Sequence, residues 1–243
     1  TSGGGGLCDV HQPGLRSGVV RRRPASCPSD LCPGSSRSDR PRWGKSPRHV
    51  GHVLARHRAQ PADRGPAQRL RDLLSESLAI SDGPSVVRFP SGAIPEDLAA
   101  TGTVGTVDVL RASDDSSRIL VVAVGATAQL CMSAAERAAQ SGASIMVVDP
   151  RWIAPLPPEL IDLARNSAAV LTVEDNTRTG GVGSRLSQLL RDSNVDVPVR
   201  DCGLPHGFLE HGKRSDVQQA AGLSVAAVSH HLGELWDVVT SDQ

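Results

Sequence analysis

The stretch Arg118-Ile-Leu-Val-Val-Ala-Val-Gly125 decides the fold class of this chain. Its apolar residues are continuous rather than alternating, and a glycine closes the run. This pattern is typical of a β-strand that is buried on both faces, as the strands of a parallel sheet are. A strand of this kind needs helices on both sides of its sheet, so the stretch indicates an α/β fold.

Strand and helix segments alternate after this stretch with a repeat of roughly 25 residues. Such alternation predicts right-handed crossovers and a mostly parallel sheet with helices on both faces. We expect further strands at 144–149, 169–173 and 197–199, and helices that follow Thr127, open at Pro157 and Pro158, cover 182–191 and begin at Ser224.

Residues that favour helix and strand ends mark several of these boundaries. Thr127 is a candidate N-cap, and Gly142 ends the same helix because glycine tolerates a left-handed backbone. Pro198 places the strand at 197–199 at an edge of the sheet, since proline cannot donate a ladder hydrogen bond. The last helix presents its large apolar residues on one side: Val225, Val228, Leu232, Leu235 and Trp236.

A shorter foldable piece precedes this region. Leucines at helical spacing predict an amphipathic helix, Asp82-Gly-Pro84 a turn, and Ser85-Val-Val-Arg-Phe89 a strand. One helix and one strand cannot form a domain, so we expect the end of a larger α/β domain. Residues 92–105 are then the linker. The leucines are Leu70, Leu73, Leu74 and Leu78.

The first 66 residues differ from the others in charge and composition. They carry 12 Lys and Arg against four Asp and no Glu, whereas residues 67–243 carry 14 basic and 22 acidic residues. They hold ten Gly and eight Pro but only nine Leu and Val. So few large apolar residues cannot offset the conformational entropy that ordering removes, and we expect residues 1–66 to be disordered.

Other protein classes are excluded by what the sequence lacks. No run approaches eighteen apolar residues, so we expect no membrane span. No apolar run follows the first residues, so we expect no secretory signal. The five cysteines are scattered and odd in number, which is typical of a reduced, cytoplasmic protein.

Five motifs in this order and at these spacings resemble 1-deoxy-D-xylulose-5-phosphate synthase, a thiamine-diphosphate enzyme of the transketolase class. Each motif is weak alone, and together they cover about residues 67–236. They are DGPSVVRFPSG at 82–92, VDPRWIAPL at 148–156, LTVED at 171–175, GGVGS at 180–184 and GLPHGFLEHG at 203–212.

The resemblance implies an enzyme of three domains. Residues 67–103 are then a remnant of the pyrimidine-binding domain plus linker, and residues 104–243 are the transketolase-like C-terminal domain. The implied reaction joins pyruvate, with loss of CO2, to glyceraldehyde 3-phosphate, for isoprenoid and thiamine biosynthesis. The family uses thiamine diphosphate and Mg²⁺, but its metal motif and catalytic glutamate lie upstream of these residues.

We therefore expect a fragment that is inactive alone, with no catalytic, cofactor-binding or metal-binding residue. The family resemblance also implies a homodimer through the C-terminal domain and small-molecule substrates. We expect no nucleic-acid or membrane partner.

The resemblance also suggests an origin for residues 1–66. Codons that encode residues 28–41 can be chosen so that the same nucleotide sequence, read one base later, encodes PATFVLDRAGLTGP. This peptide looks like part of the family's pyrimidine-binding domain. Residues 11–17 and 51–66 behave in the same way, and normal reading resumes near Ala67. We interpret residues 1–66 as out-of-frame translation.

Two positions are candidates for substrate contact. Ser91 occupies a loop position where the family pattern has a basic residue that holds the substrate's phosphate. A hydroxyl carries no charge, so this contact is weakened. Arg88 is a second candidate, although an arginine in a strand before Phe-Pro is more often structural.

Two further motifs have a functional and a structural interpretation. Gly180-Gly-Val-Gly-Ser184 could hold a phosphate at a helix N-terminus, but it has no following Lys-Ser/Thr, which favours a tight β–α turn. Glu174 and Asp175 could act as an acid–base pair, whereas such residues more often bind the following loop.

Histidines, cysteines and arginines leave further alternatives. His206, His211, His230 and His231 could suggest a metal site, but His230 and His231 are adjacent on a helix, so we expect them to point to different faces and not to share one ion. Cys8, Cys27 and Cys32 lack the spacing of a zinc site. Arg21-Arg-Arg23 could belong to a nucleic-acid arm, but Trp43 is the only aromatic residue near it.

Two rival functions remain. The domain could belong to another thiamine-dependent enzyme, such as the β subunit of a 2-oxo acid dehydrogenase. Alternatively, the chain could be a basic-tailed nucleic-acid-binding module. The motifs at 82–92 and 203–212 favour the synthase.

Overall fold

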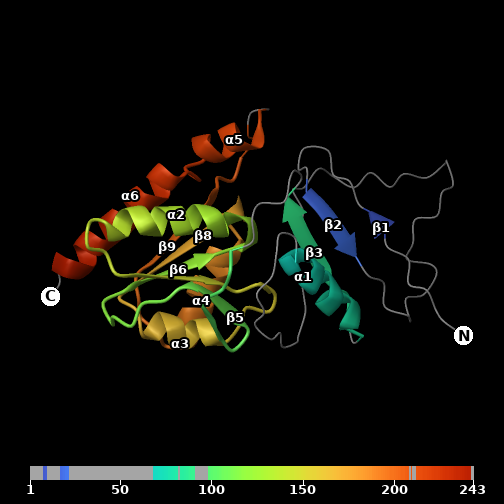
Figure 1. The fold of residues 1–243 in the computed structure, drawn as a ribbon, viewed down its shortest axis with the longest axis horizontal. Coiled ribbons are helices and arrows are strands. Elements are labelled where there is room, and N and C mark those ends of the chain that lie inside the picture. Colours follow the sequence, from blue (N-terminus) through green and yellow to red (C-terminus); the bar gives the residue numbers. More distant parts are fainter. Residues whose placement is uncertain are drawn as a thin grey trace, which may run out of the picture.

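The computed structural model describes residues 8–9, 17–21, 68–81, 83–90, 98–207, 209 and 212–241. Its largest unit is a six-stranded sheet with the order β4-β5-β7-β6-β8-β9. This unit forms the left part of Figure 1. The strands are β4 (Gly102–Val104), β5 (Val107–Arg111), β6 (Ile119–Ala123), β7 (Ile145–Asp149), β8 (Ala169–Thr177) and β9 (Val199–Leu204).

The centre of the sheet is the strand that the sequence analysis began with. All five residues of β6 are buried, and β6 pairs in parallel with β7 on one side and β8 on the other. Its Val121 lies opposite both Val147 and Leu171. The continuous apolar run therefore reflects burial on both faces, and the prediction of an α/β fold with a mostly parallel sheet is confirmed.

Helices cover both faces of the sheet. α2 (Ala128–Ala139) and α6 (Val225–Ser241) pack on the face to which Val121 belongs. α3 (Glu159–Arg165) and α4 (Val182–Asp192) pack on the opposite face. Successive residues of each strand alternate between the two apolar clusters, as the pleat of a strand requires.

β9 lies at an edge of the sheet, as Pro198 indicated, but its bounds and the opposite edge differ from the prediction. The strand expected at 197–199 begins at Val199 and continues to Leu204. Pro198 lies just before it, where its carbonyl accepts the Val170 N–H at 2.8 Å. At the other edge, β4 and β5 join the sheet in antiparallel orientation. These two strands were not predicted, nor was α5 (Arg214–Ala220), which has no buried residue.

The helix ends confirm two boundary predictions and correct a third. Gly142 has a left-handed φ of 89°, and the Ser224 hydroxyl accepts the Ala227 N–H at the start of α6. Thr127 precedes α2 but makes no side-chain cap. Its hydroxyl donates instead to the Val173 carbonyl at 2.8 Å, because the turn before α2 passes over the end of β8.

The predicted helix and strand before the domain are present as α1 (Gln68–Ala79) and β3 (Val86–Pro90). β3 pairs with β2 (Ser17–Arg21), which pairs with β1 (Cys8–Asp9), and both pairings are antiparallel. The remainder of residues 1–66 lies outside the described residues. Their disorder, their out-of-frame origin and the domain limits therefore stay predictions. No described helix is long and apolar enough to cross a membrane.

Candidate functional site

A cavity of about 140 Å³ lies at the carboxyl edge of the parallel strands. It lies next to the ends of the neighbouring strands β6 and β8. From β6 the chain crosses to β7 on one side, and from β7 it crosses back to β8 on the other side of β6, so the strand order reverses here. Such a switch in strand order is where open α/β sheets bind ligands. β3 closes the cavity from outside the domain. The polar side chains in its wall include Arg88, Arg151, Asp149, Glu174, Asp175 and Arg214.

Arg88 enters this cavity from β3. Burial lowers the pKa of its guanidinium, while the nearby Asp175 carboxylate acts in the opposite direction. Asp175 itself forms an ion pair with Arg214 of α5. The structure thus places Arg88 in a cavity wall beside charged groups, and a ligand contact by Arg88 stays a prediction. Ser91, the second predicted position, lies outside the described residues.

Glu174 is a buried carboxylate at the end of the apolar part of β8. Its Oε1 accepts the Gly183 N–H at 3.0 Å. Burial raises the pKa of Glu174, and the backbone N–H groups of Val182 and Gly183 oppose the shift. Within the described residues its Oε2 has no hydrogen-bond partner. Glu174 therefore binds the following loop, which was the structural interpretation of this residue.

The Glu174 carboxylate also occupies the space beside the glycine-rich segment before α4. A Cβ at Gly181 would lie 2.4 Å from Glu174 Oε1 and 2.4 Å from the Thr177 carbonyl oxygen. Gly180 adopts a left-handed φ of 74°. The N-terminus of α4 thus already has a carboxyl group of the chain as its hydrogen-bond partner. The tight-turn interpretation of residues 180–184 fits this geometry better than a phosphate cradle.

A cluster that the sequence analysis missed joins α1 to the sheet. The Glu76 carboxylate accepts hydrogen bonds from the Arg151 guanidinium and from Trp152 Nε1, the latter at 2.9 Å. Arg151 Nε also lies 3.8 Å from Asp108 Oδ2. Trp152 is buried against Val87 and the apolar side of α1. Local periodicity carries no signal for Glu76, because its partners are some 75 positions away in the chain.

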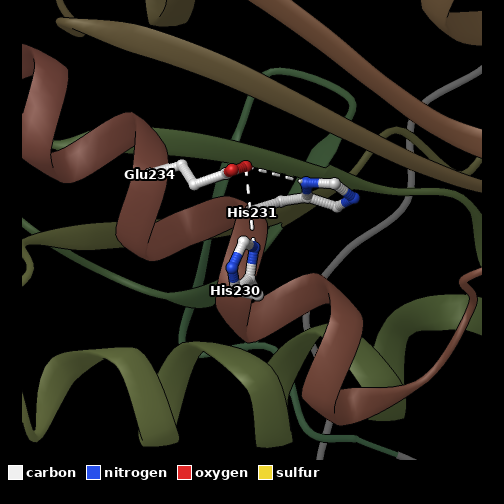
Figure 2. A group of neighbouring side chains, drawn as sticks. All are labelled: His230, His231 and Glu234. Carbon is white, nitrogen blue, oxygen red and sulfur yellow. Dashed lines mark hydrogen bonds and ion pairs between the residues drawn. The ribbon is translucent and has the colours of Figure 1, made fainter.

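Three histidines of the described part lie at the surface or close to it. His206 is exposed and belongs to no potential metal-ligand group. His230 and His231 both turn their rings toward Glu234 of α6 (Figure 2). The expectation that these adjacent residues face apart is wrong, since they precede Glu234 by four and three positions and a helix brings both spacings together. His211 lies outside the described residues.

Two cysteines of the sheet domain are buried thiols. Cys131 and Cys202 are free and belong to one apolar cluster. Burial raises the pKa of Cys202 to about 11, and burial also raises the pKa of Cys131. A thiol reacts as its thiolate, so both are poor nucleophiles and metal ligands at neutral pH.

Comparisons with known proteins agree with this architecture. The family described as Transketolase, C-terminal domain matches residues 105–228, which is just over half of the chain. A split-gene transketolase described as an inactive β4 tetramer aligns with 54% of this chain and 42% of its own, at 24% identity and a TM-score of 0.48.

Curated relatives share a larger part of the sequence. The 1-deoxy-D-xylulose-5-phosphate synthase of Frankia casuarinae is 52% identical over 169 residues, which are 68% of this chain and 25% of the relative. The synthase of a Parafrankia species is 50% identical over 169 residues and 26% of its length. This chain therefore spans about a quarter of these relatives, as expected for a portion of such an enzyme. Because the family model matches just over half of its residues, the chain belongs to the transketolase C-terminal domain family.

Proposed function

We propose that this chain supplies the C-terminal domain of a 1-deoxy-D-xylulose-5-phosphate synthase and does not catalyse the reaction alone. The observation that carries the proposal is the 52% identity over 169 residues to such a synthase. The complete enzyme would join pyruvate to glyceraldehyde 3-phosphate with loss of CO2, in the cytoplasm and for isoprenoid and thiamine biosynthesis. Thiamine diphosphate and Mg²⁺ would bind to other domains.

The role of the domain in this proposal is to dock on and support the domain that precedes it. α1 and β3 represent that domain here, and two kinds of contact hold them. Val87 packs on Trp152 in an apolar cluster, while Glu76 bridges Trp152 and Arg151 with hydrogen bonds. The bridge is largely shielded from water, since the Arg151 and Glu76 side chains are 10% and 17% exposed. Partly buried bonds to charged groups contribute more than exposed ones.

Substrate contact is the second part of the proposal. Arg88, in the middle of β3, is the charged residue of this docked strand that could reach a phosphorylated substrate from the cavity wall. Ser91 would replace the family's basic residue and weaken the phosphate contact. A homodimer through the C-terminal domain belongs to the same proposal.

A chimera tests the proposal directly. The aligned 169 residues of the Frankia casuarinae synthase are replaced by those of this chain, and formation of 1-deoxy-D-xylulose 5-phosphate is measured. We expect an active enzyme in which Ser91→Arg lowers the KM for glyceraldehyde 3-phosphate. A folded chimera with no activity would contradict the proposal.

The chain alone gives a second test. Calorimetric titration of the full chain with thiamine diphosphate and Mg²⁺ should show no binding, and no product should form from pyruvate and glyceraldehyde 3-phosphate. A micromolar isotherm would show that residues 1–66 have a role that this proposal does not include.

A further inference from the structure

His230, His231 and Glu234 form a compact group of possible metal ligands on α6 (Figure 2). One ligand atom from each residue lies within 4.8 Å of the other two. The Nδ1 atoms of His230 and His231 lie 3.7 and 3.3 Å from Glu234 Oε2. The two rings stand edge to face, with centroids 6.2 Å apart.

These separations suit a shared ion. A zinc ion 2.0–2.1 Å from each ligand atom places neighbouring ligand atoms of a tetrahedron roughly 3.3–3.5 Å apart. The Nδ1 of His231 already lies at such a distance from Glu234 Oε2, and that of His230 is a few tenths of an ångström further away. The side chains of His230, His231 and Glu234 are 70%, 37% and 46% exposed, so an ion can reach them from solvent.

A guanidinium occupies the position next to the carboxylate. Arg200 of β9 donates through Nη1 to Glu234 Oε2, and the same nitrogen lies 3.3 Å from His231 Nδ1. The Arg200 guanidinium therefore places a positive charge between the His231 imidazole and the Glu234 carboxylate.

We propose that His230, His231 and Glu234 bind a divalent transition-metal ion, which displaces Arg200 from Glu234. The ligand set selects the class of ion: imidazole nitrogen with one carboxylate suits Zn²⁺, Ni²⁺ and Co²⁺. Mg²⁺ and Ca²⁺ take oxygen ligands and are poor candidates. The proposal replaces the expectation, drawn from the sequence, that these histidines cannot share an ion. It is independent of the proposed synthase function.

The test uses Co²⁺ as a spectroscopic probe with the untagged full chain. Visible absorption should saturate at one ion per chain without a thiolate charge-transfer band, which excludes Cys8, Cys27 and Cys32 as ligands.

Matched variants separate this group from adventitious sites. His231→Gln and Glu234→Gln should each weaken Co²⁺ binding by at least about tenfold, since loss of an outer partner alone costs that much. His206→Gln should have no effect. Arg200→Gln should tighten binding by about fivefold, because a competing charge at roughly 4 Å in water is removed.

The Arg200 variant keeps the proposal testable if a histidine variant unfolds. Tight binding that survives the His231→Gln and Glu234→Gln changes together would overturn the proposal. An Arg200→Gln chain that binds Co²⁺ no better, or more weakly, would overturn it as well.

Discussion

Glu174 is the residue that links the cavity, the glycine turn and the end of β8. Its carboxylate is buried beneath the N-terminus of α4, where it accepts the Gly183 N–H. The cost of removing a carboxylate from water is partly offset by these backbone donors and by the positive end of the helix. Because burial is the larger influence, the pKa of Glu174 is raised above its ordinary value of 4.5.

This shift predicts a specific pH dependence of stability. Above pH 4.5 the folded chain still holds a proton on Glu174 that the unfolded chain has lost, so stability falls as the pH rises through this window. Glu174→Gln cannot ionise and should lack that decrease. Urea unfolding at a series of pH values measures the difference, with the exposed Glu136→Gln as control. Parallel curves for wild type and Glu174→Gln would contradict the prediction.

Glu76 is the residue on which the attachment of α1 depends. Glu76→Gln removes one of the two ionic partners of Arg151 and leaves Asp108, and it should cost about 1–3 kcal/mol, since a partly buried charge loses its hydrogen-bonded partner. The matched control is Asp162→Asn, whose ion pair with Arg165 is exposed and should contribute less than about 1 kcal/mol.

Hydrogen exchange locates this effect. The amides of α1 and β3 should lose protection in Glu76→Gln, whereas those of β6 should not change. Equal loss of protection in β6 would mean that the contact supports the whole domain rather than the docking of α1.

At the scale of elements, the β8–α4 turn depends on two glycines for different reasons. Gly183 is needed for space, because a Cβ there would lie 2.4 Å from Thr172 Oγ1 and 2.6 Å from the Asp201 Cβ. Gly180 is needed for conformation, since its φ is 74° and a Cβ would meet no atom within 4 Å. Close approach lets α4 rest on β8 and β9.

The two causes predict different responses to substitution. Gly183→Ala should cost about 1–3 kcal/mol by overpacking. Gly180→Asn should cost less than about 1 kcal/mol, because asparagine tolerates a left-handed backbone, while Gly180→Ala should cost about 1–2 kcal/mol. Urea unfolding followed by tryptophan fluorescence ranks the three variants. A Gly183→Ala chain as stable as wild type would show that α4 can move away from the sheet.

At the scale of the whole molecule, α6 is the element through which a second copy could bind. Trp236 is half-buried and packs against the apolar cluster of the sheet, whereas Val238 is 50% exposed. The structure therefore gives Trp236 a role in the core and leaves Val238 as the available apolar contact. The homodimer itself stays a proposal.

Sedimentation and unfolding of two variants distinguish a role in the core from a role in a dimer interface. Trp236→Ala should lower the free energy of unfolding by about 2 kcal/mol, since half of a large side chain loses its contacts. Val238→Ser should leave stability within about 0.5 kcal/mol and weaken self-association. If the wild type remains monomeric at high concentration, α6 is not a dimer contact.

Hydrogen exchange also tests the expectation that residues 1–66 are disordered. If residues 1–66 lack a packed core, their amides should exchange rapidly, and slow amides should begin near Leu70. Slow exchange within β2 would show instead that its pairing with β3 is stable in solution and that the expectation of disorder is wrong.

The sequence by itself determined the fold class and most of the domain. The run at 118–125, the helix after Thr127 and the glycine at 142 carry local signals, because burial on two faces and left-handed turns each restrict which residues can occupy a position. The same holds for α1 and β3. β4 and α5 were not predicted because a three-residue edge strand and a helix with no buried residue have too little apolar patterning to reveal them.

Only the tertiary structure decided which side chains meet. Glu76 with Trp152, and the group on α6 with Arg200 of β9, each join residues whose spacing in the chain bears no relation to their contact. Local periodicity reports the average environment of a residue, such as a buried face or a turn. Partners from distant elements are set by the order of the strands and the packing of helices across them, which no local pattern contains.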